Sequence, residues 1–437
     1  MAEILTHKRV LQFSLPIVLS NATVPILGAV DTGVVGQLGE AAPIGAVGIG
    51  AIILTAFYWI FGFLRMGTAG LTAQAKGAKD DGEVAALLSR ALLIGVAAGA
   101  FFIIAQVVLF WLAFKLSPAS AEVEGLARQY MAIRVWSAPA AIALYGITGW
   151  LVALERTGAI LAIQLLMNVL NIVLDLVFVL QFDAGVAGVA WATLIAEWSG
   201  LVLGLWLCRA AFAGPAWRDW ARVFDRVRLR HMALVNGDIM IRSVLLQAIF
   251  VSFLFWGADF GDVNLAANQI LLQFLFATSF ALDGFAFAAE AMVGQALGAR
   301  NRAALRRAAL LTSMWGLAIC MALALCFALI GGVVIDVMTT SHDVRDAGRA
   351  FLPYMVAAPL VGVAAWMLDG IYIGATRTVD MRNMMLISAA IYFITVPFLM
   401  AWLGNHGLWL ALLISFAVRG ITLALRYPRL EAEADRV

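Results

Sequence analysis

The chain has 437 residues, of which 63% are hydrophobic and 13% are charged, and its formal net charge is +2. Soluble globular domains carry roughly 25% charged residues, so this composition excludes an ordinary soluble enzyme, and the near balance of charge gives no indication of a nucleic-acid partner. The hydrophobic residues come in runs of about 20 or more, which is the length that an α-helix needs to cross a bilayer. We therefore expect an all-α integral membrane protein.

In chain order, these runs predict twelve transmembrane helices, six before and six after a polar stretch in the middle. The first six are expected near residues 10–37, 44–74, 86–114, 126–153, 159–180 and 186–208. The other six are expected near residues 234–258, 263–296, 304–331, 347–374, 384–403 and 406–426. Lysine and arginine concentrate in alternate connections, as the positive-inside rule describes, and this pattern predicts that both termini are cytoplasmic.

The two halves of the chain resemble each other, which indicates an internal repeat. Ala-Gln-Ala-Lys-Gly-Ala-Lys-Asp at 73–80 is similar to Gly-Gln-Ala-Leu-Gly-Ala-Arg-Asn at 294–301, at an offset of 221 residues. We therefore divide the chain into an N-terminal lobe at 1–208, a cytoplasmic linker at 209–231 and a C-terminal lobe at 232–437. Because each half has an even number of helices, a pseudo-twofold axis along the membrane normal is expected to relate the lobes.

Acidic residues inside the predicted helices are the main functional candidates, because an intramembrane charge costs at least about 2.5 kcal/mol. The first lobe places acids and polar partners in three helices: Asp31 in the first, Asn168, Asn171 and Asp175 in the fifth, and Thr193 and Glu197 in the sixth. By helical rise, Asp31 lies about 30 Å and Asp175 about 24 Å from the cytoplasmic ends, so the two carboxylates are expected to meet. Two close carboxylates in a low dielectric share a proton, as proton coupling requires. The alternative is that Asp31 hydrogen-bonds a neighbouring helix and Asp175 lies at the wet outer interface.

The second lobe has three further acids, Asp283, Glu290 and Asp369. Asp283 and Glu290 are seven residues apart and share a helical face, so together with Asp369 they are candidates for a second cation, proton or substrate site. In the alternative interpretation, Glu290 and Asp369 anchor loops through Arg300 or Arg377.

Other charged and helix-breaking residues are predicted to serve the structure. Asp238 and Arg242 are four residues apart and are expected to form an ion pair within one helix. Pro16 and Pro25 lie in the first helix below Asp31 and are expected to kink it. The kink either lets the helix bend when Asp31 changes charge or is a fixed feature of packing.

Motifs for other kinds of chemistry are absent from the sequence. There is no Gly-x-x-x-x-Gly-Lys-Ser/Thr loop for nucleotide binding and no His-Glu-x-x-His motif, and the three cysteines lack the spacing of metal ligands. We therefore expect no cofactor and no bound metal other than a coupling ion. A secondary transporter is predicted rather than an enzyme.

Several motifs resemble those of the MATE multidrug and toxic-compound extrusion transporters. They are Leu-Pro-Ile at 15–17, Val-Asp-Thr at 30–32, Gly-Leu-Thr-Ala-Gln-Ala at 70–75, Asn-Ile-Val-Leu-Asp at 171–175, Ala-Leu-Asp-Gly-Phe-Ala at 281–286 and Leu-Asp-Gly-Ile-Tyr-Ile-Gly-Ala-Thr-Arg at 368–377. The last two resemble the DinF branch in particular. This resemblance extends over nearly the whole chain and implies the V-shaped MATE fold in the inner membrane of a bacterium.

The same resemblance implies roles for individual residues. Asp31 matches the proton-site aspartate of the family, with polar partners at Asp175, Asn171 and Thr193. Pro16 matches the proline at which the first helix is thought to bend. Asp369 resembles the acid that is associated with sodium in the NorM branch.

The expected function is secondary active efflux. We expect a monomer, in contact with membrane lipids, that exports amphipathic and often cationic drugs in exchange for protons by alternating access. The alternatives are sodium or both ions as the coupling species, and a flippase for lipids or lipid-linked precursors. A flippase calls for a wide basic cleft, whereas few buried lysine or arginine residues are expected here.

Overall fold

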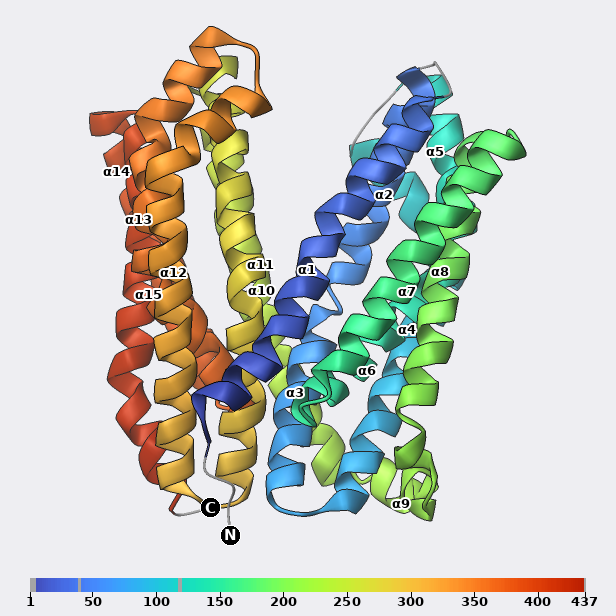
Figure 1. Cartoon of the computed structure of the whole chain (residues 1–437), viewed down its shortest axis with the longest axis vertical. Helices are drawn as coiled ribbons and strands as arrows, with labels where there is room; N and C mark the ends of the chain where they lie inside the picture. Colours follow the sequence, from blue (N-terminus) through green and yellow to red (C-terminus); the bar gives the residue numbers. More distant parts are fainter. Residues whose placement is uncertain (1–4, 38–40, 117–119, 436–437) are drawn as a thin grey trace. The chain divides into compact units, whose positions relative to one another are not determined.

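The computed structural model of the chain describes residues 5–37, 41–116 and 120–435, and the regular elements in these ranges are all helices (Figure 1). The helices of the first half are α1 His7–Gly36, α2 Ala41–Trp59, α3 Gly62–Gly77, α4 Asp81–Leu116, α5 Ala121–Arg134, α6 Ala138–Ala153, α7 Thr157–Asp175 and α8 Gly185–Leu207. After the short α9 Trp220–Val223 come α10 Arg226–Ala258, α11 Asp262–Gly298, α12 Arg302–Met338, α13 His342–Gly374, α14 Thr378–Leu403 and α15 Asn405–Glu433.

Eleven helical stretches within the described ranges are long and apolar enough to cross a membrane. Three of them combine two elements: α2 with α3, α5 with α6, and α7 with the π-helical residues Leu176–Gln181. Together with α1, which has 30 residues, they match the twelve predicted helices one to one. The predicted fold class, an all-helical multi-pass membrane protein, is therefore confirmed.

The chain forms two compact units, judged by which residues pack together. The C-terminal unit contains the described residues up to Val18, Ala73–Lys79 and the chain from His231 onward. The N-terminal unit contains Leu19–Thr72 and Asp80–Arg230. The start of α1 and the end of α3 thus pack with the second half of the chain. The predicted lobes stay a prediction, because packing alone does not show which parts move together.

The polar connection between the halves is packed onto α4. Arg90, which is 2% exposed, donates through Nε to the carbonyl of Val223 at 2.8 Å and through Nη1 to Glu83 at 2.6 Å. Ser89 Oγ donates to the carbonyl of Trp217 at 2.7 Å. Because a buried guanidinium needs partners, these bonds fix the connection to the N-terminal unit.

Asp80, at the start of α4, adds a second attachment. Its carboxylate accepts from the Glu83 amide at 3.0 Å and from Arg222 Nη1 at 2.8 Å. Partial burial opposes ionisation, but these bonds and the charges of Arg222 and Arg228 hold the pKa of Asp80 below its usual value. The attachment therefore contributes stability near neutral pH that is lost as the pH falls through the folded-state pKa.

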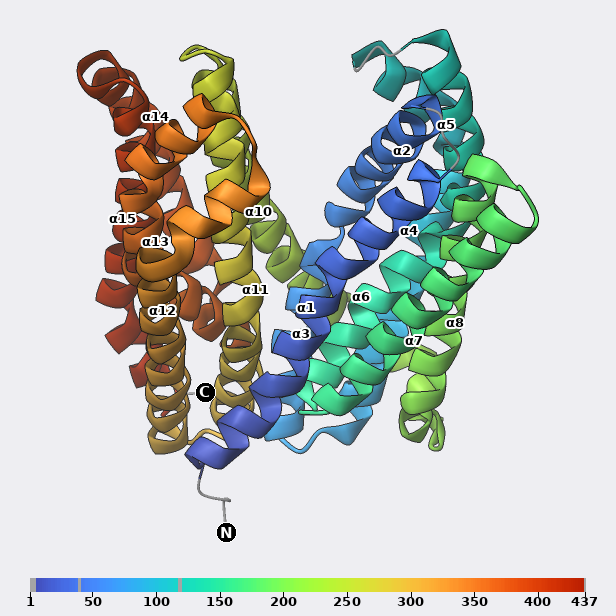
Figure 2. The same ribbon diagram turned by 45° about the horizontal axis from the view of Figure 1, so that its top comes forward.

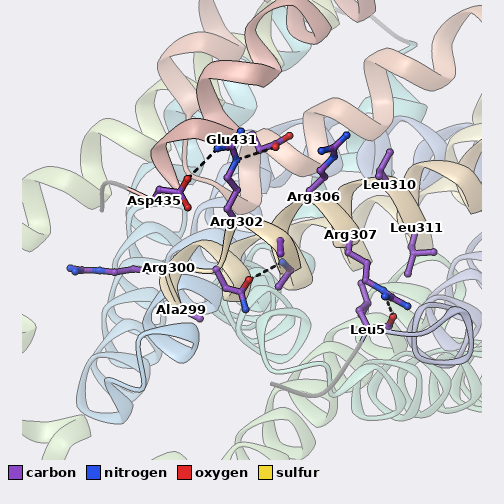
Figure 3. A pocket seen from close by; sticks show the side chains of 13 residues that line it. Leu5, Ala299, Arg300, Arg302, Arg306, Arg307, Leu310, Leu311, Glu431 and Asp435 are labelled. Atoms are coloured by element: carbon purple, nitrogen blue, oxygen red, sulfur yellow. Dashed lines mark hydrogen bonds and ion pairs between the residues drawn. The ribbon is translucent and has the colours of Figure 1, made fainter. Parts of the chain in front are cut away.

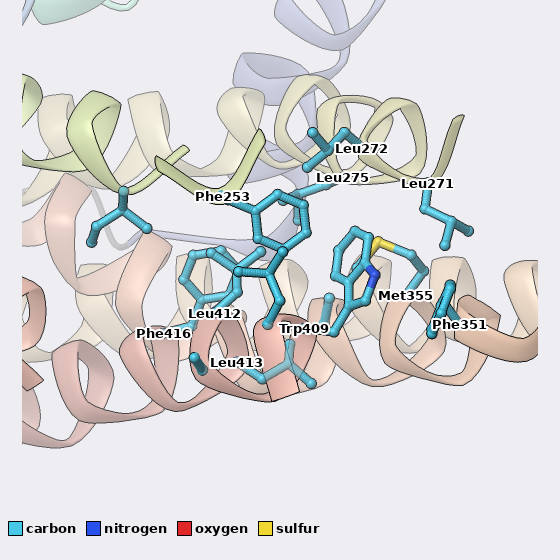
Figure 4. Close-up of a cluster of buried hydrophobic side chains, with 14 of the residues drawn as sticks. Phe253, Leu271, Leu272, Leu275, Phe351, Met355, Trp409, Leu412, Leu413 and Phe416 are labelled. Atoms are coloured by element: carbon cyan, nitrogen blue, oxygen red, sulfur yellow. The ribbon is translucent and has the colours of Figure 1, made fainter. Parts of the chain in front are cut away.

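The core of the C-terminal unit is a cluster of aromatic and aliphatic side chains contributed by all the helices from α10 to α15, part of which is drawn in Figure 4. Phe253 and Trp409 are fully buried in it and make an edge-to-face pair with centroids 4.5 Å apart. Trp409 Nε1 donates to Asn268 Oδ1 at 2.9 Å, and Asn268 and Asn405 exchange hydrogen bonds of 2.8 and 2.9 Å. The side chains of Trp409, Asn268 and Asn405 thus satisfy one another inside the protein, as a hydrocarbon surrounding favours. Helices α12 to α15 lie together in Figure 1 and Figure 2.

The internal repeat extends to the packing of glycines inside each unit. Gly149 lies against the backbone of Arg65 in the N-terminal unit, and Gly370 lies against the backbone of Ala286 in the C-terminal unit. Gly370 lies 221 residues after Gly149, and Ala286 lies 221 residues after Arg65. This spacing is the offset of the repeat found in the sequence. In each, a Cβ atom on the glycine would overlap a carbonyl oxygen, so only glycine permits this close helix crossing.

A reciprocal pair of glycines joins the end of α3 to the end of α11 within the C-terminal unit. Gly77 lies against the carbonyl of Gln295, and Gly298 lies against the carbonyl of Gln74. Gln74 also donates through Nε2 to the carbonyl of Gly374 at 3.1 Å. The two copies of the repeated segment, residues 73–80 and 294–301, therefore pack against each other.

We predict that Gly298→Ala destabilises the protein, because the added methyl group overlaps the carbonyl oxygen of Gln74 and overpacking costs about 1–3 kcal/mol. The matched control is Gly237→Ala in α10, where the methyl group meets no described atom within 4 Å. The control should be neutral or slightly stabilising, since alanine favours a helix over glycine by about 1 kcal/mol. The measurement is the unfolding temperature of each purified variant in detergent, and equal temperatures would contradict the role given to Gly298.

Candidate functional site

A buried polar stripe runs along α7 in the N-terminal unit. Asn168, Asn171 and Asp175 are 5%, 1% and 0% exposed. Asn171 donates through Nδ2 to Thr193 Oγ1 on α8 at 3.0 Å, and Thr193 donates to the carbonyl of Val189 at 3.0 Å. The structure thus brings together the polar faces that sequence spacing placed on α7 and α8.

The stripe is also connected to α1. Asn168 donates through Nδ2 to Thr23 Oγ1 at 2.6 Å, and its own Oδ1 accepts from Gln164 at 2.9 Å. Asp31 lies two turns further along α1, but its side chain is outside the described residues. The meeting of Asp31 and Asp175 therefore stays a prediction.

Asp175 stands where the α-helix changes its winding. It is the last residue of α7, and residues Leu176–Gln181 continue as a π-helix. Such wide turns inside helices are found mainly at functional sites, because they re-aim side chains at the expense of regular hydrogen bonding. The carboxylate at this junction is fully buried.

Glu197, which was grouped with this site by sequence, has a partner on another helix. Its carboxylate lies 3.1 Å from Nη1 of Arg134 at the end of α5, and Arg134 is 6% exposed. Arg134 lies inside the predicted helix at 126–153, and as an intramembrane cation it carries the same signal as the intramembrane acids.

The second-lobe acids are arranged differently from the expectation. Asp369 on α13 pairs with Arg242 on α10, and Arg419 on α15 lies 3.7 Å from the same carboxylate oxygen. We call these three residues the Arg–Asp–Arg triad. Asp369 is 4% exposed, Arg242 is 8% exposed and Arg419 is 1% exposed. The predicted ion pair between Asp238 and Arg242 is therefore wrong.

Asp238 finds its partners on α14 instead. It accepts from Arg382 Nη1 at 2.6 Å and from Thr378 Oγ1 at 3.0 Å. Spacing along one helix identified the residues but not their partners, because the preferred partners come from helices far away in the sequence.

Asp283 and Glu290 lie on α11, the first half-buried and the second 2% exposed. The Glu290 backbone lies against Gly374 of α13, in one of the close crossings of these helices. The alternative in which Asp369 anchors a loop through Arg377 is wrong, since Arg377 pairs with Glu433. Arg300 makes no ion pair with any described residue, so it does not anchor Glu290.

The two prolines lie within a helix that the structure shows as continuous from His7 to Gly36. The helix belongs to the C-terminal unit up to Val18 and to the N-terminal unit from Leu19. Pro16 thus stands two residues before the point where α1 passes from one unit to the other. A kink at Pro16 or Pro25 stays a prediction.

Comparison with known proteins agrees with this architecture. The MatE family model matches residues 16–177 and 239–399, which are one segment in each half. The chain is 36% identical to the DNA damage-inducible protein F of Escherichia coli over 441 residues, covering 97% of this chain and 92% of that protein. It is 25% identical to a probable multidrug resistance protein NorM of Synechococcus, covering 96% and 93%.

Solved structures show the same fold. The Vibrio cholerae MATE transporter VcmN in the bent form matches with a TM-score of 0.88 at 20% identity, covering 98% of both chains. An outward-facing multidrug resistance MATE family transporter matches with a TM-score of 0.88 at 18% identity, covering 98% of this chain and 96% of that one. From the family model and the extent of these matches, the chain belongs to the MATE family and is a multi-pass membrane transporter of the secondary type rather than an enzyme.

Proposed function

We propose that this protein is a proton-coupled efflux antiporter that exports amphipathic, often cationic, organic compounds by alternating access. The observation that supports proton coupling most directly is the buried carboxylate of Asp175, which lies in a stripe of amide and hydroxyl groups on α7 and α8. Relatives that are named multidrug resistance proteins support the substrate class. We also propose residence in a bacterial inner membrane with both termini cytoplasmic, which the relative in Escherichia coli and the distribution of lysine and arginine support.

Asp175 is fully buried and continues the polar stripe on α7. The other side chains described on the stripe, Asn168, Asn171 and Thr193, form hydrogen bonds between helices. A buried carboxyl group that gains or loses a proton changes both its charge and its hydrogen bonds, as a coupling site requires. Asp31 on α1 completes the proposed coupling site, and α1 transmits the change because Asn168 is bonded to Thr23.

Protonation drives transport only if the two states of the protein bind the proton with different affinity. We propose that the protonated site favours the state that releases substrate outward and that deprotonation favours reloading. The bend in α1 at Pro16, next to the residue where this helix changes unit, is the proposed mechanical link.

The second-lobe acids are less suited to hold the coupling ion. Asp369 already lies between two guanidinium groups, so a sodium ion there would have to compete with Arg242 and Arg419. We therefore propose that the Arg–Asp–Arg triad holds α10, α13 and α15 together. Asp283 and Glu290 remain candidates for a second cation or substrate site.

A flippase for lipid-linked precursors is the second candidate, and four basic residues are buried in the described part of the chain. Arg90, Arg134, Arg242 and Arg419 are each at most 8% exposed. All four are nevertheless engaged with carboxylates of their own unit. A flippase needs cations that are free to receive a phosphate, so these arginines favour efflux of organic cations.

The central prediction concerns Asp175. Replacement by asparagine keeps the shape but removes the titrating group, so proton-driven drug efflux from inverted vesicles should fall by on the order of tenfold or more. Asp31→Asn should have the same effect. The matched control is Asp183→Asn, which changes an exposed acid just beyond the same helix and should leave efflux unchanged. Efflux that is driven by sodium and survives Asp31→Asn and Asp175→Asn would overturn the first-lobe mechanism.

A further prediction separates structure from coupling at the Arg–Asp–Arg triad. Asp369→Asn leaves two buried guanidinium groups without their carboxylate, and breaking such a pair costs about 3–5 kcal/mol. The unfolding temperature in detergent should therefore drop, and Arg419→Met in the same chain should restore part of it. If Asp369→Asn kept the wild-type unfolding temperature and abolished sodium-driven efflux, Asp369 would be an ion site instead.

A further inference from the structure

A basic cavity lies at the start of α12, outside the proposed coupling site and entirely within the C-terminal unit. Its volume is about 1200 Å³. Its walls contain four arginines, Arg300, Arg302, Arg306 and Arg307, and two carboxylates, Glu431 and Asp435, together with leucine and alanine side chains. The lining therefore has an excess of positive charge beside an apolar surface.

Both carboxylates of the cavity form ion pairs with the same arginine. Arg302 lies between Glu431 at 3.1 Å and Asp435 at 3.2 Å, as the dashed lines in Figure 3 show. Arg306 has no ion pair with any described residue, and Arg307 donates only to the carbonyl of Leu5, at 2.7 Å. Two guanidinium groups thus keep their full charge without a counter-ion from the described chain.

Arg306 and Arg307 extend from α12 beside Leu310 and Leu311, whereas Arg300 extends away from them (Figure 3). Arg306 and Arg307 thus stand between the other charged residues of the cavity and the apolar surface of α12. Basic side chains take such a position at the edge of a bilayer. This end of α12 is on the side predicted to be cytoplasmic, where anionic lipids attract basic residues.

Above the arginines, α12 presents a continuous apolar stripe. Leu310, Met314, Leu317 and Met321 follow one another at intervals of four, three and four residues and therefore share one face. They are 61%, 48%, 42% and 52% exposed. An acyl chain lying along this stripe would have its headgroup level with Arg306.

We propose that Arg306, Arg307 and the stripe on α12 form a binding site for an anionic phospholipid. The phosphate of the headgroup binds the guanidinium group of Arg306, which stands one turn before Leu310 on the same face of α12, and Arg307 adds positive charge at the same level of the helix. One acyl chain covers the stripe that begins at Leu310. Charge complementarity favours an anionic lipid over a zwitterionic one, because the positive charge on a neighbouring choline would be repelled by the same arginines.

The test is native mass spectrometry of the delipidated full chain in detergent, titrated with phosphatidylglycerol or with phosphatidylcholine of the same acyl chains. The wild type should bind one phosphatidylglycerol at least about tenfold more tightly than phosphatidylcholine. Arg306→Gln combined with Arg307→Gln should remove this preference. Retention of the preference in the double variant would overturn the proposal.

The matched control is Arg226→Gln combined with Arg230→Gln, which removes two exposed arginines from the start of α10. This variant has the same net charge as the test variant and should keep the preference for phosphatidylglycerol. An equal loss in both variants would show a diffuse effect of surface charge and would also overturn the proposal. The unfolding temperature of each variant, measured without lipid, checks that both are folded.

A competition arm distinguishes lipid from soluble phosphate. Glycerol 3-phosphate at the concentration of the lipid should not displace phosphatidylglycerol, because it lacks the acyl chain that contacts α12. Displacement at equal concentration would assign the cavity to soluble phosphate compounds and would overturn the assignment to lipid. Because binding is measured without transport, these results do not depend on the coupling ion.

Discussion

A charge that is buried among membrane-spanning helices is stable only when another helix supplies its partner. Removing an ion from water costs several kcal/mol even after the protein relaxes, and no water competes for it inside the bundle. In this chain, Arg134 of α5 is held by Glu197 of α8, and Arg242 of α10 is held by Asp369 of α13. Each pair fixes where two segments meet, so the charges determine the arrangement that the hydrophobic surface leaves open.

The two halves share their backbone contacts but not their charges. The glycine crossings at Gly149 and Gly370 are equivalent under the repeat. By contrast, the position equivalent to Asp369 in the first half is Thr148, one residue before Gly149. Close helix crossings depend on small residues and tolerate no replacement, whereas side chains around them can change. The repeat therefore preserved a scaffold while each half acquired its own polar interior.

The helices and the α7 stripe could be predicted because they depend on local pattern. Hydrophobic runs identified all twelve helices, and spacing placed Asn168, Asn171 and Asp175 on one face. The contact between Asn171 and Thr193 follows from two such faces on consecutive helices.

Partners across distant helices could not be predicted in this way. Spacing suggested that Asp238 would pair with Arg242, yet Arg382 and Asp369 are the actual partners. Arg419 lies well inside a predicted apolar helix. The cost of placing a charge inside the membrane marks such an arginine as unusual, just as it marks the acids. Local spacing says which residues are unusual, and only the packing of the whole unit says what satisfies them.

The reciprocal contact of Gly77 with Gln295 and of Gly298 with Gln74 has the form of an interface between identical subunits. In a twofold dimer, residue i of one chain touches residue j of the other, and j touches i in return. Here the two copies of the segment lie in one polypeptide, and they contact each other as two identical subunits would. The repeated segment is thus complementary to its own copy, so one short sequence pattern provides both sides of the contact.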